Sequence, residues 1–455
     1  MRFHLQHTMA AVVGLILSSA APLAWSTATA EEAAQLKTTL TPFGAEKAGN
    51  KEGTIPAWTG GMTQAPADYK NGAARPDFFA SDKPVLTITG KNVDQHADKL
   101  SEATKAMLKK YPDYRLDVYP TRRSAAAPQW VYDNTFKNAT RAKTTKAGEE
   151  VEGAFGGVPF PIPKEARELM WNHRTQWTGE SSVGQFSTWI VTGQGKRLLA
   201  TKYDQWFVNP YYFKEGSAEN FDGLFIKNKI ITLEPASKAG EGLVNWQSLD
   251  NDKTSVWQYL VGQRRVRRSP SIAYDTPNFI TSGIGLFDEA FGVFGWLDRH
   301  EMKIVGKQEM YIPYNANKAA SATTEQLLTP NFLNPDFVRW ELHRVWVVEA
   351  TLKEGKRHVV PKRRYYLDED TWNIALSDGW DAKGDLWRGY FSLPLLAPDI
   401  PALLGNIVNW GGYNVQTGEY YLSVATQGLP VQYQIESRRP AAFFSPDSLA
   451  TEGGR

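Results

Sequence analysis

The sequence predicts an α+β, β-rich protein built on one large curved antiparallel sheet, a half-open barrel with helices covering its concave face. Two observations favour the sheet. Aromatic residues make up 12% of the 455 residues, yet the mean hydropathy is −0.43. This combination suits a sheet with a cavity or groove, because aromatic rings pack on pleated surfaces and tolerate partial exposure. From about Gln185 onward, short period-two runs joined by brief turns are typical of an antiparallel meander.

The first thirty residues are typical of a secretory signal peptide. A weakly basic start precedes an apolar run from Met9 to Leu17, and Ala28-Thr-Ala30 is a small-x-small site before Glu31. No later stretch approaches the roughly 20 apolar residues of a transmembrane helix. The chain contains no cysteine, which excludes disulfides, thiol catalysis, zinc–thiolate sites and a lipidation cysteine. We therefore expect a mature protein that starts near Glu31 and is soluble in the periplasm.

The mature chain is predicted to have an N-terminal extended and helical segment, residues 31–164, that packs on the sheet. Within it, Glu31 to Leu40 is a candidate short helix, Asn92 to Lys110 an amphipathic helix, and Tyr119 to Val131 is extended.

The stretch from Thr41 to Gly61 is dense in glycine and proline and lacks periodicity. Such a stretch is ordered only when tertiary contacts hold it. We expect it to pack across the sheet, with Trp58 as its anchor.

Residues 165–455 are predicted to form the sheet domain with its lid elements. A proline-stiffened linker, Gly156 to Pro163, leads into a helix from Glu165 to Arg174. The strands that follow are expected at Ser187–Thr192, Gly223–Leu233, Val256–Ser269, Val345–Leu352, Lys356–Leu367, Asn373–Asp378, Leu386–Leu393 and Glu419–Thr426. Alternation places Trp346, Val348 and Ala350 on one face and Val345 and Val347 on the other. Gly283 to Trp296 alternates glycine with large apolar residues and is predicted to be a lid or loop near the sheet.

The most informative stretch, Ser255 to Ser269, is predicted to be a β-hairpin. Trp257 and Tyr259 alternate on its first strand, and after Gly262 the second strand carries Arg264, Arg265, Arg267 and Arg268. An arginine stem can cover apolar surface while its charged head stays wet or paired. A solvated face is the usual role of such a run, but the flanking aromatic residues favour contact with a lid or a ligand head group.

This hairpin resembles the Trp-x-Tyr-(turn)-Arg-Arg-Val-Arg-Arg signature of periplasmic lipoprotein-sorting-like domains, the superfamily of the bacterial lipoprotein carrier and its receptor. Further landmarks resemble those of one uncharacterised Gram-negative family, usually labelled outer-membrane lipoprotein-sorting protein: Thr41–Asn50, Ile55–Gly61, Val118–Arg123, Gly156–Pro163 and Trp171-Asn-His173. The resemblance covers essentially the whole mature chain. It implies a curved half-open sheet with a helical lid, no established catalytic residue, and two envelope partners: an inner-membrane exporter of the resistance-nodulation-division type and an outer-membrane protein.

No catalytic or metal-binding motif emerges from the sequence. The histidines after the signal lack His-x-x-x-His spacing; they are His96, His173, His300, His343 and His358. Gly179 to Gly184 is not a nucleophile elbow, because Val183 stands where the second glycine is needed.

Two acidic clusters are predicted to be structural. Asp298-Arg-His300-Glu301 is expected in a solvated loop. Asp378, Asp381 and Asp385 lack the glycine and glutamate positions of an EF-hand and are expected to form turns. The net charge of +2 also provides no basic field for nucleic acid.

These observations predict a periplasmic binding or carrier protein for a lipid-like or hydrophobic molecule, working with envelope transport machinery and needing no cofactor or metal. The expected ligand-binding residues are Trp257, Tyr259, Trp346, Tyr366, Trp387, Arg264, Arg265, Arg267 and Arg268. Two alternatives stay open. A periplasmic hydrolase acting on carbohydrate or lipid is one, because carboxylates distant in sequence can converge in space. An envelope adaptor that binds no ligand is the other.

Overall fold

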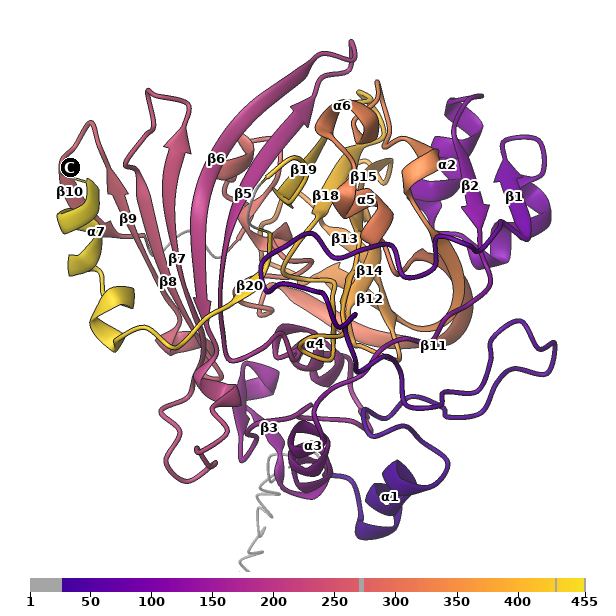
Figure 1. Cartoon of the computed structure of the whole chain (residues 1–455), viewed down its shortest axis with the longest axis horizontal. Helices are drawn as coiled ribbons and strands as arrows, with labels where there is room; N and C mark the ends of the chain where they lie inside the picture. The colour runs from indigo at the N-terminus through magenta and orange to yellow at the C-terminus, as the bar shows by residue number, and fades with distance from the viewer. Residues whose placement is uncertain (1–26, 270–273, 430–431, 454–455) are drawn as a thin grey trace, which may run out of the picture.

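A 16-stranded sheet forms the body of the computed structural model, which describes residues 27–269, 274–429 and 432–453 (Figure 1). The predicted signal peptide, residues 1–30, lies outside the described residues except for its last four. Along the main path of the sheet the strands are β1 (Leu86–Thr89), β2 (Arg115–Val118), β12 (Trp340–Leu352), β13 (Lys362–Asp368), β14 (Ile374–Trp380), β15 (Leu386–Ser392), β18 (Trp410–Asn414), β19 (Tyr420–Ala425), β5 (Ser181–Val191), β6 (Arg197–Val208), β7 (Leu224–Glu234), β8 (Gly242–Ser248), β9 (Ser255–Leu260) and β10 (Arg265–Arg268).

Two further strands join this sheet beside the path: β11 (His300–Pro313) pairs with β12, and β20 (Gln434–Ile435) pairs with β5. Neighbouring strands pair antiparallel, apart from a single parallel pair between Val118 of β2 and Trp340 of β12. Within the described residues, nothing pairs β1 with β10, so the sheet stays open. The predicted large, open, mostly antiparallel sheet is confirmed.

The two faces of the sheet bury different residues, as the alternation in β12 predicts. Trp346, Val348 and Ala350 belong to one core, together with residues of strands as far apart as β8 and β13. Since this single core joins both wings of the sheet, its face is concave, and we call it the inner face. Val345 and Val347 point to the opposite, outer face and belong to a second core.

Helices and loops cover both faces. Helix α4 (Ala166–Arg174) and residues 274–297, which we call the cap, pack on the inner face. Helix α2 (Glu102–Lys110) packs on the outer face. The remaining helices and small strands are α1 (Ala30–Ala34), α3 (Gln129–Arg141), α5 (Asn317–Ser321), α6 (Thr324–Leu327), α7 (Asp447–Gly453), β3 (Lys143–Thr145), β4 (Glu150–Glu152), β16 (Leu395–Ala397) and β17 (Ala402–Leu404).

The long helix expected from Asn92 to Lys110 is two helices. A 3-10 helix spans Val93–Lys99, and α2 begins after Ser101, whose hydroxyl accepts a hydrogen bond from Thr104 N at 3.2 Å. Asp378 supplies a second cap from the sheet, since its carboxylate accepts from Glu102 N and Ala103 N at 2.8 Å each. Asp378 is fully buried in β14, so its predicted role as a turn former is wrong.

The sequence expectations also missed several elements. Helix α3 begins at Gln129, inside the stretch expected to be extended, and many of its residues have low helix propensity. Strands β6, β8, β11 and β18 were not predicted. The cluster at Asp298–Glu301 is not a solvated loop throughout, because His300 begins β11, is buried, and its Nε2 contacts Val360 O at 3.1 Å.

The glycine- and proline-rich stretch from Thr41 to Gly61 is held against the body by Ile55 and Arg123. Ile55 is 1% exposed in the outer-face core. Arg123, buried in an ion pair with Asp370, donates to the backbone carbonyl of Glu46 at 2.7 Å. Trp58 is only half-buried, and its Nε1 donates to Ala125 O at 2.9 Å. Ile55, rather than Trp58, is therefore the apolar anchor.

We expect Ile55→Ala to lower the free energy of unfolding by roughly 2–5 kcal/mol, because it leaves a cavity in the core. Trp58→Phe keeps a ring and removes one donor, so it should cost only about 1 kcal/mol. Urea unfolding followed by fluorescence measures both, with the exposed Lys51→Ala as the control. A Trp58 variant that loses more stability than the Ile55 variant would contradict this assignment.

Candidate ligand site

Helix α4 lies against the inner face and is fixed by side chains of the Trp171-Asn-His landmark. Asn172 bridges both backbone groups of Phe160, accepting from its N at 2.9 Å and donating to its O at 2.7 Å. The indole of Trp171 donates to Gly148 O at 2.9 Å. Because both side chains are fully buried with their polar atoms paired, α4 is a rigid wall.

His173 connects this wall to the cap and to β14. Its Nε2 contacts Phe291 O at 2.7 Å, and its Nδ1 accepts from Ile374 N at 3.1 Å. The two contacts are satisfied together by the neutral ring with its proton on Nε2. Burial lowers the pKa of His173 to about 4. Gly292 (φ +88°) permits this approach, since a Cβ there would lie 3.0 Å from His173 Nε2.

Two carboxylates of the cap form buried ion pairs with the sheet. Asp288 accepts from Arg363 of β13 at 2.6 Å and from His358 at 2.8 Å. Glu289 accepts from Arg388 of β15 at 2.6 Å. Burial opposes the ionisation of Asp288, but the positive charge of Arg363 outweighs it and holds the pKa of Asp288 below its usual range.

Two adjoining cavities remain between the inner face and these covering elements. The first, which we call the α4 cavity, has a volume of about 40 Å³ and is lined by residues including His173, Arg174 and Gln176. The second, the cap cavity, also has about 40 Å³ and is lined by residues including Gln205 and Phe287. Asn228 and Phe291 line both cavities. The two cavities therefore adjoin at Asn228 and Phe291, and we call them together the chamber.

The chamber wall contains buried polar atoms without partners. Gln205 of β6, Asn228 of β7 and Asn245 of β8 are at most 3% exposed. Both side-chain polar atoms of Gln205 and the side-chain oxygens of the two asparagines have no hydrogen-bond partner among the described residues. Leaving such a group unpaired costs about 1–3 kcal/mol. Water or a ligand inside the chamber can satisfy these atoms.

The predicted ligand-binding residues do not converge on this chamber. Trp257 and Tyr259 lie on the other side of β9 and pack with Leu449 of α7. Val256, the residue before Trp257, points to the opposite face of β9 and lines the cap cavity. Period-two alternation therefore correctly places Trp257 and Tyr259 on the same face of β9, but α7 covers that face.

The other three predicted aromatic residues are also separate. Trp346 lies on the inner face and stacks on Trp372, with ring centroids 6.4 Å apart. Tyr366 points to the outer face, where its hydroxyl donates to Asp378 at 2.8 Å. Trp387 is half-buried beside the Arg388 guanidinium.

All four predicted arginines of the hairpin, Arg264, Arg265, Arg267 and Arg268, are exposed. Arg268 donates to Ser255 Oγ at 2.7 Å, and Arg264 occupies the turn with φ +48°. None of them lines either cavity. The arginines that contact the cap, Arg363 and Arg388, come instead from β13 and β15, outside the hairpin.

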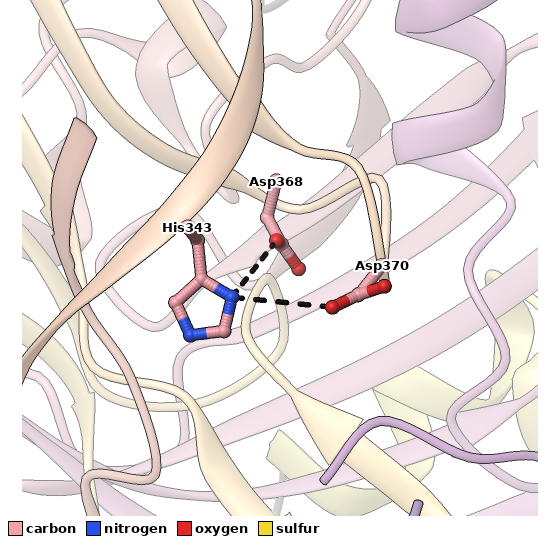
Figure 2. A group of neighbouring side chains, drawn as sticks. All are labelled: His343, Asp368 and Asp370. Atoms are coloured by element: carbon pink, nitrogen blue, oxygen red, sulfur yellow. Dashed lines mark ion pairs between the residues drawn. The ribbon is translucent and has the colours of Figure 1, made fainter. Parts of the chain in front are cut away.

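A buried charge cluster lies at the end of β13 (Figure 2). Nδ1 of His343 is 3.8 Å from Asp368 and 3.9 Å from Asp370, and its Nε2 is 3.0 Å from Glu341. Burial opposes a proton on His343, but Glu341 and the two aspartates outweigh it and raise its pKa. Burial and the neighbouring Asp370 raise the pKa of Asp368 to about 7.

The positive and negative side chains of this cluster neutralise one another. Both oxygens of Asp370 accept from Arg123 at 2.7 and 2.9 Å, and the His343 ring stacks on Tyr314 at 3.8 Å. A cation bound there would compete with the Arg123 guanidinium. The cluster lines neither cavity of the chamber. It therefore ties the N-terminal stretch to the sheet and does not provide the carboxylate cleft that the hydrolase alternative requires.

A wider groove, with a volume of about 540 Å³, lies on the outside of the molecule. Phe213, Phe221 and Phe444 line it, and Arg438 stands over the Phe213 ring at 4.1 Å. Arg438 is paired with Glu215 and Glu180. Among the described residues, none that lines this groove has an unpartnered buried side-chain atom, whereas several residues of the chamber wall do.

Comparison with known proteins identifies relatives over most of the chain. The model of the DUF1329 family, a protein of unknown function, matches residues 87–450. The uncharacterized protein PA3922 of Pseudomonas aeruginosa is 39% identical over 379 residues, 82% of this chain and 83% of that protein.

Two solved structures are similar at low sequence identity. A domain from Vibrio parahaemolyticus named for outer membrane lipoprotein sorting is 13% identical with a TM-score of 0.40, covering 62% of this chain and 97% of that one. A DUF1329 family protein from Desulfovibrio piger is 14% identical with a TM-score of 0.40, covering 62% and 96%. The resemblance to an uncharacterised family, read from the sequence landmarks, is confirmed by the family match.

We expect the stability of the protein to fall as the pH drops from about 6.5 to about 4. In that range His173 binds a proton in the unfolded chain but stays neutral in the folded protein. Lowering the pH therefore favours the unfolded state. The depressed pKa of His173 corresponds to a loss of about 3 kcal/mol over this range. His173→Gln should flatten the plot of unfolding free energy against pH, measured by urea titration. His96→Gln, at a half-exposed histidine, is the control. An equally steep plot for His173→Gln would show that other groups cause the acid sensitivity.

Proposed function

This chain belongs to the DUF1329 family, and from the geometry of its inner face we propose that it is a binding or carrier protein for a lipid-like, amphipathic molecule. The single observation that carries the proposal is the chamber beneath the cap. Its wall combines apolar and aromatic side chains, such as Phe287 and Trp410, with unpartnered buried carboxamides. Ligand sites typically join a mostly apolar lining to a few fixed polar groups.

The backbone of the cap supports a role as a gate. Phe291 lines both cavities and adopts φ +57°, a left-handed conformation that a bulky side chain rarely takes. Strain of this kind costs about 1–3 kcal/mol and concentrates at ligand clamps and switches. Entry of a molecule larger than a few waters requires the cap to move outward. We infer that Phe291 turns away when a ligand enters.

Carriage through the periplasm fits the features of the sequence. The signal-like first thirty residues imply export, and among the described residues we find no helix long and apolar enough to cross a membrane. A carrier that closes over its cargo needs partners that load and unload it. We propose an inner-membrane exporter of the resistance-nodulation-division type and an outer-membrane protein in those roles, as the family resemblance implies.

Gln205→Met tests the chamber as a binding site. Methionine has nearly the same shape and removes two unpartnered polar atoms, so the free energy of unfolding should rise by about 1 kcal/mol. Retention of the natural ligand should fall about tenfold if those atoms bind it. Native mass spectrometry of protein purified in mild detergent, with lipid extraction, measures the occupancy.

Asn138→Leu is the matched control for this experiment. Asn138 is equally buried, but its amide is fully paired with Gly157 O and Val158 O, and its oxygen accepts from Phe155 N. This variant should lose at least about 2 kcal/mol and keep its ligand. Wild-type protein that purifies without ligand and does not bind the uncharged probe N-phenylnaphthylamine would contradict the carrier proposal.

A further inference from the structure

One arginine of the chamber wall carries a buried charge that the protein does not balance. Arg174 is the last residue of α4 and is 7% exposed. Its Nη1 donates to Asn251 Oδ1 at 3.0 Å, whereas Nε and Nη2 have no partner among the described residues. The guanidinium rests on the Trp171 ring at 4.2 Å. Arg174 lines the α4 cavity.

The other buried arginines of the described residues show how unusual this is. Each of them contacts a carboxylate: Arg75 with Asp399, Arg123 with Asp370, Arg339 with Asp82, Arg344 with Glu369, Arg363 with Asp288 and Arg388 with Glu289. The carboxylate whose charge acts on Arg174 is Glu149, which already pairs with Arg167 and accepts from Asn251 at 2.7 Å. Burial lowers the pKa of Arg174 to about 10.

A buried arginine without a counter-ion is expensive, because a charge removed from water must be paired to be tolerated. The C-terminal end of α4 offsets only part of this cost through the helix dipole. The other unpartnered polar atoms of the chamber wall include both hydrogen-bond donors and hydrogen-bond acceptors. Gln176 presents an unpartnered amide nitrogen beside Arg174, and Asn228 and Asn406 present unpartnered oxygens. The wall therefore offers donors to an anion and acceptors to hydroxyl or amide groups.

We propose that Arg174 is an anion-binding residue of the chamber, and that the cargo is an amphiphile with a carboxylate, phosphate or sulfonate beside hydroxyl or amide donors. This inference rests on the proposed carrier function and specifies its ligand. The anion accepts from Nε and Nη2 of Arg174, the donors of the cargo reach the carboxamide oxygens, and its apolar part lies against Phe291 and Val293.

A pair of fluorescent probes of nearly the same skeleton tests this assignment. N-phenylnaphthylamine is uncharged, and anilinonaphthalene sulfonate adds one sulfonate. Delipidated wild-type protein should bind the sulfonate probe at least about tenfold more tightly than N-phenylnaphthylamine, because the sulfonate can accept two charge-assisted hydrogen bonds from Arg174. Arg174→Met should lower the sulfonate affinity at least about tenfold and change the affinity for the uncharged probe less than about twofold. Arg174→Lys should restore part of the sulfonate affinity.

Arg75→Met is the matched control, since it removes a buried arginine that is fully paired with Asp399. It should lower the melting temperature and leave the ratio of the two affinities unchanged. Arg174→Met should keep or raise the melting temperature. A large fall in its melting temperature with unchanged sulfonate binding would show that Arg174 is a structural residue and overturn the inference.

The remaining outcomes separate this inference from the carrier proposal. If both probes bind with equal affinity, or lose affinity equally in Arg174→Met, the anion assignment is wrong and the carrier proposal stands. If neither probe binds the wild-type protein, the carrier proposal and this inference fail together. Inorganic phosphate in excess should not displace the sulfonate probe. Displacement would show that the site takes small free anions, and the amphiphile assignment would be wrong.

Discussion

The two buried ion pairs between cap and sheet, Asp288 with Arg363 and Glu289 with Arg388, determine whether the chamber exists. Without them the inner face would carry two uncompensated arginines, and breaking a buried pair costs about 3–5 kcal/mol. Relative to a well-packed apolar contact, such pairs add little stability. The two ion pairs instead fix the position of the cap, because the planar guanidinium donates to a carboxylate in one preferred geometry. They fix the cap over β13 and β15, and the nearby residue Phe291 therefore lies over the cavities.

The polar interior follows a different rule from the rest of the fold. Buried side chains such as Asn138 and Asn172 have their polar atoms paired, and paired groups make a single arrangement stable. Gln205 and Arg174, which line the two adjoining cavities, depart from this rule. Unpartnered buried atoms also occur outside the chamber, for example at Asn373 and Gln432. Proteins tolerate such departures mainly at functional sites, where binding recovers the cost. The departures in the chamber wall include residues of β6, β7, β8 and α4, which share no sequence motif.

Much of the fold could be predicted from the sequence, but the site could not. Alternation in β12 correctly separates Trp346 and Val348 from Val347, because period two is a local property of a strand. Alternation cannot tell which face is inside, and it gives no sign that α7, almost 200 residues later, covers the face of β9 that carries Trp257. Asp378 illustrates the same limit, since its partners on α2 lie about 275 residues earlier. Missing partners, as at Arg174, are visible only in three dimensions.

The position of the arginine-rich strand β10, at one edge of the sheet, explains its role. An open sheet leaves unpaired backbone groups at its edge, and such an edge can pair with another chain. Charged side chains on an edge strand oppose that pairing, since a second copy would bring like charges together. Arg265, Arg267 and Arg268 are exposed on β10, while the face of β9 behind them is covered by α7. The same residues that suggest a ligand head group in the sequence therefore protect the open edge of the sheet, and Arg174, the residue that we propose binds an anion, lies on the inner side of the sheet, on α4.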